Sequence, residues 1–423
     1  MGTHSGSKSE RSTSTVFWTY WSASTVSSVG SAVSTVALPL VAVSVLQASA
    51  LEVGLLTAAS YVGWLVLGLP AGVIVGRLPL RGTQVAMDLA RALALAGIPL
   101  AWWLGVLTLA QLILAALVVG FANVLFDVGS MTLLPALVPK DQLIARNSLT
   151  SATHATTQLA GPSLGGLLVQ MLGPVPAVFV DTASYLASAV LIGRLPQRDV
   201  PQPATRTPVG AMIREGWHYV TRHPVMSPCM WAATAVNCAC GALLALTPLY
   251  LVRVLHAPAW LVGVLMATDG LGALVGAALT PRLSRRAGSA RAILLAGLVG
   301  AGFALLMPVG SGTTGMLLFG VGNAGFAAGV VVLSINTRTY RQTHSPPVLL
   351  SRVMATVRFV SWGAVPIGSL VAGGLATWLG TRPALWLTCA APAIPLVILW
   401  LSPVRTRRQL DEVPVPVPVG PSA

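Results

Sequence analysis

The chain has 423 residues, of which 55% are hydrophobic and only 9% are charged. Its mean hydropathy is +0.79. A soluble globular domain carries about 25% charged residues, so this composition excludes an ordinary water-soluble protein. The formal net charge of +14 does not indicate a nucleic-acid partner, because the basic residues lie in short gaps between apolar runs and not on a polar face.

Apolar runs of 18 or more residues recur along the chain, each long enough to cross about 30 Å of hydrocarbon. Bounded by charges, proline and glycine, they predict twelve transmembrane helices. We expect an all-α polytopic membrane protein with two six-helix bundles. The predicted spans are 17–45, 53–75, 83–104, 108–137, 144–172, 176–193, 226–252, 260–280, 291–309, 314–340, 352–379 and 384–401.

The longest internal polar stretch, residues 194–225, divides the chain into halves and holds five arginines around a proline-rich piece. The predicted parts are an N-terminal tail, a first bundle, a linker, a second bundle and a disordered C-terminal tail. Their bounds are 1–16, 17–193, 194–225, 226–402 and 403–423. The alternating prolines of the tail favour disorder.

Basic residues gather on one side of the predicted spans. With both termini inside, 21 lysines and arginines lie on the cytoplasmic side, and only Arg253 and Arg382 lie outside. Arg91 and Arg358 fall within spans. Because cytoplasmic loops carry the excess of positive charge, this asymmetry predicts an even number of crossings with both termini in the cytoplasm.

The two halves share sequence. An offset of 209 residues aligns Gly54, Gly63 and Arg77 with Gly263, Gly272 and Arg286, and an offset of 200 aligns Gly120, Asn123 and Gly129 with Gly320, Asn323 and Gly329. Both offsets agree on a six-plus-six arrangement. Parallel repeats about an axis along the membrane normal, with a site between them near the midplane, are a transporter architecture.

Several motifs resemble the major facilitator superfamily, specifically its bacterial efflux branch of macrolide-type and siderophore exporters. They include AGVIVGRLPLRG, MDLARAL, GPSLGG and SRVMATVRFVSWGAVPIG, and the resemblance covers about residues 17 to 402. The superfamily's loop motif after the second helix is matched at Gly72, Arg77 and Arg81, but its Asp position is Gly76 here. The second half has Arg285 at that position, followed by Arg286.

The resemblance implies alternating access, with conformational roles for the residues of these motifs. They are Gly72, Arg77, Arg81, Asp88, Arg91, Gly161, Pro162, Gly165, Gly166 and Arg286. Asp88 and Arg91 could pair with the Arg77 loop in place of the missing acid. GPSLGG also has a physical interpretation, because glycines four residues apart let a neighbouring helix approach closely and Pro162 permits a bend. The alternative is that these small residues only pack helices in lipid.

Ionisable groups within the spans are the main functional candidates, since a charge at mid-span costs about 2.5–3.5 kcal/mol or more without a partner or water. Asp269 lies near the middle of the eighth span, and its repeat equivalent is Ser60. It is either a cavity acid that carries a proton or meets a cationic substrate, or a structural partner of a nearby amide or arginine.

Asp127 and His154 lie at equal distances from the loop between the fourth and fifth spans, so a helical hairpin places them at similar depth. They could exchange protons as a pair. The alternative is that His154 is an ordinary interhelical donor. Asn123 and Gln158 lie one turn deeper on the same faces.

Asp88 and Asp181 fall in the first turns of predicted helices, where the helix dipole favours carboxylates, so we expect them to cap helices. Arg358 either extends to the cytoplasmic interface or pairs with a cavity acid, and Trp362 lies deeper than the other tryptophans. The polar or aromatic candidates for substrate binding are Asn123, Gln158, Asn237, Asp269, Asn323, Arg358 and Trp362. The candidates for proton coupling are Asp269, Asp127 and His154.

No ATP-binding loop, HExxH or CxxC occurs, so we expect no enzyme, cofactor or metal site. The expected protein is a monomeric secondary transporter in a bacterial plasma membrane that exports a hydrophobic or amphipathic small molecule in exchange for protons. A metabolite importer coupled by proton symport and a transport-inactive receptor or scaffold are the alternatives. The arginine-rich, lysine-poor composition favours a bacterial genome rich in G and C.

Overall fold

The computed structural model describes residues 4–68, 70–139, 142–197 and 209–412, and within these ranges every regular element is helical. The α-helices are α1 (His4–Leu40), α2 (Ala50–Leu67), α3 (Ala71–Gly76), α4 (Leu80–Trp103), α5 (Leu109–Leu137), α6 (Leu143–Leu172), α7 (Pro174–Gly193), α8 (Val209–Arg222), α9 (Met226–Leu249), α10 (Ala259–Ala287), α11 (Ser289–Ala304), α12 (Gly312–His344), α13 (Pro347–Leu379), α14 (Thr381–Ala390) and α15 (Ala393–Trp400). Short π-helical turns are η1 (Val41–Val45) and η2 (Tyr250–Val254), and 3₁₀ turns are η3 (Pro403–Thr406) and η4 (Leu410–Glu412).

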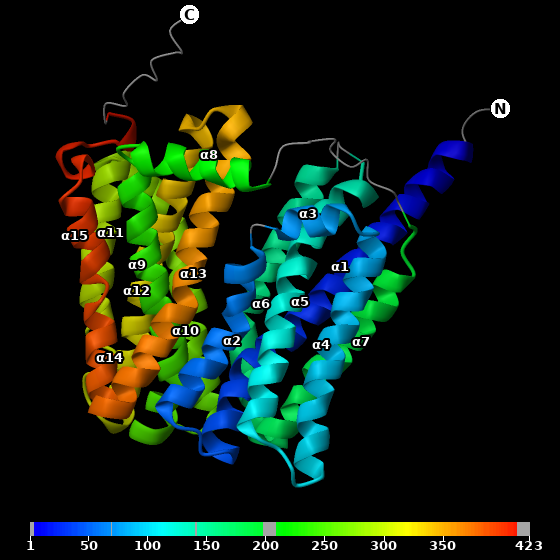
Figure 1. The fold of residues 1–423 in the computed structure, drawn as a ribbon, viewed down its shortest axis with the longest axis horizontal. Helices are drawn as coiled ribbons and strands as arrows, with labels where there is room; N and C mark the ends of the chain where they lie inside the picture. The colour runs from blue at the N-terminus through cyan, green and yellow to red at the C-terminus, as the bar shows by residue number, and fades with distance from the viewer. Residues whose placement is uncertain (1–3, 69, 140–141, 198–208, 413–423) are drawn as a thin grey trace, which may run out of the picture.

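The helices form two groups that stand side by side (Figure 1). The N-terminal group is α1–α7 and the C-terminal group is α8–α15. Helix α8 lies across one end of the molecule, which we call the α8 end, and the opposite end is the far end. The long helices run between the two ends in alternating directions.

The outer faces of both groups are apolar. Trp378 is 88% exposed, Leu93 74% and Leu317 67%, and many other large hydrophobic side chains share this exposure. A water-soluble protein rarely exposes so continuous an apolar surface. Ten helical segments of the described chain are long and apolar enough to cross a membrane, so the molecule is a multi-pass membrane protein.

The backbone repeats one irregularity in both groups. The π-helical turns η1 and η2 follow the first long helix of each group, and residues Gln47 and His256 behind them both have φ of 52°. A positive φ is uncommon for residues other than glycine. The two turns and the two residues are each separated by 209 positions, which is the offset of the sequence repeat. The predicted relation between the halves is therefore visible in the fold.

Equivalent glycines make equivalent contacts. A Cβ atom added to Gly54 of α2 would lie 2.6 Å from the carbonyl oxygen of Ser369 in α13, and one added to Gly263 of α10 would lie 2.3 Å from that of Pro162 in α6. Both contacts cross from one group to the other. Close approach of backbones through small residues is how membrane helices pack, so these glycines seal the two groups together near the far end.

The GPSLGG segment lies within α6 and serves two neighbours. A Cβ on Gly161 would meet Ala32 of α1 at 2.2 Å, and one on Gly165 would meet the same helix at Val33. Gly166 instead faces α10, where its added Cβ would lie 2.9 Å from the Cα of Gly263. The predicted close helix approach is confirmed, and the motif joins the groups as well as packing within one.

At the far end a cation also links the groups. The guanidinium of Arg253 donates to the carbonyl oxygen of Ala48 at 2.6 Å, and Arg253 is one of the two basic residues predicted outside. Its partner carbonyl follows η1, so the contact ties the repeated π-helical turns of the two halves to each other.

The α8 end differs in two places from our expectations. Part of the predicted linker folds as helix α8, which packs on α13, where Glu215 forms an ion pair with Arg352. Residues 403–412, which we expected to be disordered, instead fold against the C-terminal group with Val404 and Leu410 buried. The N-terminal tail is helical from His4, and residues 198–208 and 413–423 lie outside the described residues.

A buried histidine joins α8 to α9. The Nδ1 atom of His223 accepts the backbone N–H groups of Val225 and Met226, both at 3.2 Å, and its ring contacts Tyr219 and Tyr340. Burial, together with the nearby His344, lowers the pKa of His223 to about 4. The neutral ring is therefore the form that caps α9.

Acid should destabilise this junction. Between pH 6.5, the ordinary pKa of histidine, and the folded value near 4, His223 is protonated in the unfolded chain and neutral in the folded chain. The free energy of unfolding therefore falls as the pH drops through that interval. We expect the melting temperature of the protein in detergent to fall on acidification, and His223→Asn to reduce that fall. Asparagine accepts the same N–H groups without titrating. His218→Asn, at an exposed histidine of α8, is the matched control. An unchanged pH dependence in the His223 variant would contradict the assignment.

Candidate functional site

An arginine from one group is held by a tryptophan from the other. The guanidinium of Arg358 in α13 lies 4.3 Å from the ring centroid of Trp64 in α2 and 5.3 Å from that of Trp362. The two indole rings are 5.5 Å apart. Cation–π contacts of this kind stabilise a desolvated guanidinium by roughly 2 kcal/mol. Our expectation that Arg358 extends to the interface or pairs directly with an acid is therefore replaced by an aromatic cage between the groups.

Trp64 was not among the sequence candidates. It lies in the middle of the predicted span 53–75, where the pattern does not distinguish a tryptophan that faces lipid from one that faces a partner helix. One signal was present, because Trp64 follows Gly63, a position of the repeat. That glycine packs on the backbone of Gly120 in α5 and so fixes which face of α2 turns toward the other group.

Asp127 of α5 faces this cage. Its side chain is exposed, and the charges within electrostatic range are Arg91, Arg358 and His154. No hydrogen bond joins Asp127 to another side chain among the described residues, so the predicted direct pair with His154 does not form. His154 instead contacts Gln158 in the next turn of α6, with 3.4 Å between their Nε2 atoms. The side chains of Asp127 and His154 nevertheless lie within electrostatic range of each other, as the hairpin predicts.

Asp269 lies in α10 on the other side of the space between the groups. Its side chain is exposed, and it lies within electrostatic range of Tyr61 of α2 and Cys240 of α9. It forms no ion pair in the described part of the chain. The side-chain amide of Asn323 donates a hydrogen bond of 3.0 Å to the hydroxyl oxygen of the neighbouring Thr268. The alternative that Asp269 is a structural partner of a nearby amide or arginine is therefore not supported by a contact of its carboxylate among the described residues.

Two of the predicted amides have local partners. Asn237 donates to the carbonyl oxygen of Ala233 in its own helix at 2.8 Å. The side-chain oxygen of Asn123 accepts a hydrogen bond of 2.9 Å from the guanidinium of Arg91. These two amide groups are therefore held in place, whereas Gln158 of α6 and Asp269 of α10 are exposed.

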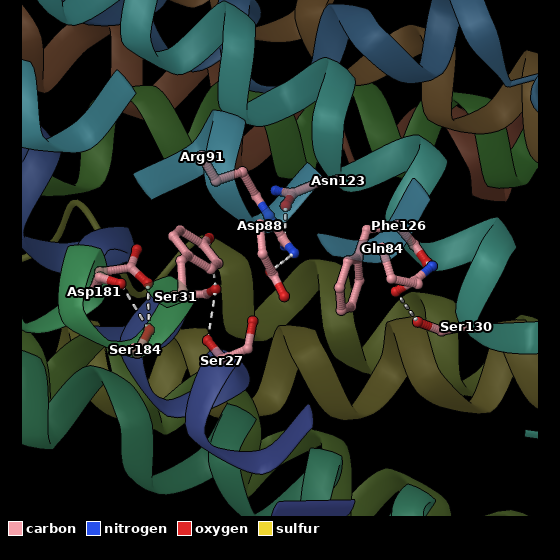
Figure 2. Close-up of polar contacts among 11 residues, drawn as sticks. Ser27, Ser31, Gln84, Asp88, Arg91, Asn123, Phe126, Ser130, Asp181 and Ser184 are labelled. Atoms are coloured by element: carbon pink, nitrogen blue, oxygen red, sulfur yellow. Dashed lines mark hydrogen bonds and ion pairs between the residues drawn. The ribbon is translucent and has the colours of Figure 1, made fainter. Parts of the chain in front are cut away.

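A second charged cluster lies inside the N-terminal group (Figure 2). Arg91 forms a buried ion pair with Asp88 one turn away in α4. Its guanidinium lies 4.1 Å from the ring centroid of Phe126 and 4.3 Å from that of Tyr185. Our capping prediction for Asp88 is wrong, because α4 begins at Leu80, earlier than predicted, and Asp88 falls well inside the helix.

Asp181 belongs to the same cluster. It is 1% exposed in the third turn of α7, and its Oδ1 atom accepts the hydroxyl of Ser184 at 3.1 Å. The hydroxyl groups of Tyr185 and Ser31 are hydrogen-bonded at 2.9 Å. The capping prediction for Asp181 is also wrong, since Gly173 and Pro174 start α7 too far from it.

The loop arginines make backbone contacts only, as far as the described residues show. Arg81 donates to the carbonyl oxygen of Leu195 at 2.8 Å and so holds the end of α7. Arg77 and Arg286 are exposed at the α8 end, as the repeat predicted, and Gly72 lies in α3. Asp88 pairs with Arg91 and not with the Arg77 loop, which corrects our expectation for this acid.

Comparison with known proteins identifies the family of this chain. The family model described as transmembrane secretion effector matches residues 11–419, nearly the whole chain. The chain belongs to this family. Its members are major facilitator transporters, and the similar proteins found are transporters and not enzymes.

Individual relatives are distant. An uncharacterized MFS-type transporter of Sinorhizobium fredii is 29% identical over 77% of this chain and 80% of its own length. The multidrug efflux pump Tap of Mycolicibacterium fortuitum is 28% identical over 83% of this chain and 86% of its own. A crystal structure of the nucleoside transporter NupG has a TM-score of 0.70 at 11% identity, covering 91% of this chain and 98% of that one. At this identity the last comparison shows the fold alone.

The buried ion pair yields a stability prediction. Arg91→Gln leaves the Asp88 carboxylate buried without a cation, which typically costs about 3–5 kcal/mol. We expect a marked drop in melting temperature of the purified protein for the single variant. The double variant Arg91→Gln with Asp88→Asn should recover most of the loss, because no buried charge remains unpaired. Equal losses in the single and double variants would show that the pair does not act as one unit.

Proposed function

We propose that this protein is a proton-coupled exporter of hydrophobic or amphipathic small molecules that works by alternating access. It acts as a monomer with twelve crossings in the bacterial plasma membrane, and both termini and the α8 end lie in the cytoplasm. Helices α6 and α11 complete the twelve beside the ten segments that length and hydropathy identify. The two six-helix bundles are residues 17–193 and 226–402, joined by the linker 194–225.

The observation that carries the proposal is the pair of exposed carboxylates, Asp127 and Asp269, one in each of the two sequence-related groups and neither in an ion pair among the described residues. A carboxylate inside a membrane needs a cation, water or a proton. Exposure without an ion pair among the described residues supports a water-filled site open to one side. The glycine and Arg253 contacts lie toward the far end, which supports opening toward the α8 end in this conformation.

The proposed direction of transport is outward. Relatives named as multidrug efflux pumps favour export. The charge asymmetry of 21 basic residues against two supports the α8 end as cytoplasmic, so the conformation described is open inward. An exporter in this state accepts substrate from the cytoplasm or the inner leaflet.

The residues between the groups divide into two kinds. The caged Arg358 with Trp64 and Trp362 offers aromatic surface and one fixed positive charge, which suits flat, amphipathic molecules. Asp269 offers a negative charge without a competing cation, which suits a substrate amine or a proton. Asn123, Gln158, Asn237 and Asn323 complete the substrate set, and Asp127 with His154 completes the proton-coupling set.

The glycines of α6 have the conformational role in this scheme. Gly161 and Gly165 bind α6 to α1 within its own group, and Gly166 opposes Gly263 across the groups. Rocking of the bundles changes the contact of Gly166 with Gly263 and preserves the contact of α6 with α1. The arginines at the α8 end, Arg77, Arg81 and Arg286, lie where the bundles would close in the outward-open state.

Transport in inside-out vesicles tests the proposal. With the lumen acidified by respiration, ethidium and a macrolide should each release lumenal protons in vesicles that contain the protein. Asp127→Asn and Asp269→Asn should each reduce that flux by about tenfold or more, since each removes a group that can carry the proton. Asp411→Asn, an exposed acid at the α8 end, is the matched control and should leave it unchanged.

Each other outcome selects an alternative. Full proton-driven export by both Asn variants at normal expression would contradict the coupling roles. Substrate and proton moving in the same direction would indicate an importer. Absence of both fluxes across a broad drug panel would favour a receptor or scaffold.

A further inference from the structure

The acid Asp181 is built into the interior of the N-terminal group and away from the space between the groups. Gly30 of α1 makes room for it, since a Cβ there would lie 2.7 Å from Oδ1 of Asp181 and 2.0 Å from Oγ of Ser184. The other carboxyl oxygen, Oδ2, is buried and has no hydrogen-bond partner among the described residues. The hydroxyl of Ser34 lies near the carboxyl group and is also buried without a partner there.

The cluster contains one more carboxyl group than guanidinium groups. Two carboxyl groups, Asp88 and Asp181, share one guanidinium, that of Arg91, and only Asp88 forms the ion pair. The elements packed around Asp181 are α1, which contributes serines here, and α4, which contributes Asp88 and Arg91. A second carboxylate without a cation in such surroundings carries a large desolvation cost that the neutral acid does not. One bound proton makes the cluster neutral.

The cluster connects to the exposed acid. Tyr185 lies one turn after Asp181 on the same face of α7, and its ring stacks on the Arg91 guanidinium. Arg91 in turn donates to Asn123, which lies one turn from Asp127 on α5. Arg91 is within electrostatic range of both Asp127 and Asp181. A change of charge at Asp181 therefore alters the field on a buried arginine that also acts on Asp127.

The scaffold does not require these groups. At the repeat offset of 209, Asp88 and Arg91 correspond to Gly297 and Gly300 of α11. These glycines line a small apolar pocket in the C-terminal group, together with Phe326, the equivalent of Phe126 at the offset of 200. The same fold thus packs with no charge at all at the position where the N-terminal group keeps two acids and an arginine.

We propose that Asp181 holds the coupled proton inside the N-terminal group, so that the proton site and the substrate site are separate. This rests on the proposed function. A proton from outside binds the Asp181 carboxylate at Oδ2, and the resulting O–H group donates to Oγ of Ser34. After the bundles rock inward, the O–H bond breaks and the proton leaves to the cytoplasm. Asp127 and Asp269, which are exposed between the groups, meet substrate and exchange the proton with water, while Asp181 stores it.

Separating exchange from coupling tests the inference in proteoliposomes. Ethidium counterflow at equal pH needs no net proton movement, whereas ethidium uptake driven by a pH gradient does. We expect Asp181→Asn to keep counterflow within about twofold, to lose gradient-driven uptake by about tenfold or more, and to lose the pH dependence of uptake, because asparagine cannot bind the proton. Ser184→Ala is the matched control, because it removes a hydrogen bond to Asp181 and keeps the acid. Retention of gradient-driven uptake by Asp181→Asn would overturn the inference, and so would a loss in Ser184→Ala as large as in Asp181→Asn.

A spectroscopic measurement decides the case if Asp181→Asn fails to fold. In the double variant Asp127→Asn, Asp269→Asn, which keeps Asp88 and its ion pair with Arg91, we expect an infrared carbonyl band of a protonated carboxyl at neutral pH. Its absence would overturn the inference. If the wild type shows no proton flux, the proposed function fails while this band still reports on Asp181. If the wild type couples and Asp181→Asn couples equally, only the inference fails.

Discussion

A charge inside the hydrocarbon of a membrane needs an opposite charge, contact with water or a bound proton, and this constraint organises the whole molecule. Each ionisable group within the spans meets it differently. Arg91 is paired with Asp88 and enclosed by aromatic rings, and Arg358 is caged by indoles from both groups. Asp127 and Asp269 meet it by exposure between the groups. These different solutions separate side chains that stabilise the fold from those that can change charge during a transport cycle.

The architecture repeats while the chemistry does not. Both groups use a π-helical turn after their first long helix, and both send a glycine from α2 or α10 across to the other group. In contrast, the equivalents of Asp88, Arg91 and Asp127 in the second half are Gly297, Gly300 and Ala327. Two similar halves allow rocking about a common centre, and unequal halves allow one of them to carry the charged groups.

Much of this arrangement could be predicted from the sequence. Apolar run lengths indicated the helices, and the offset of 209 residues predicted two related halves, in which Gly54 and Gly263 make equivalent contacts. The errors have physical causes. Proline and glycine before α4 and α7 start these helices earlier than polarity indicates, so Asp88 and Asp181 were placed near helix ends and assigned to capping. Trp64 was missed because a tryptophan inside an apolar run has the same sequence pattern whether it faces lipid or a partner helix.

The central claim is that the two groups move as units about the site between them. Spin labels at Leu78 and Gln342 report the separation of the groups at the α8 end, and labels at Val106 and Val309 report it at the far end. All four are exposed, and the four native cysteines are replaced by serine beforehand. Double electron–electron resonance should show, on a change between acidic and alkaline buffer with ethidium present, that one distance shortens while the other lengthens. Two distances that stay fixed, or that change in the same direction, would contradict the account.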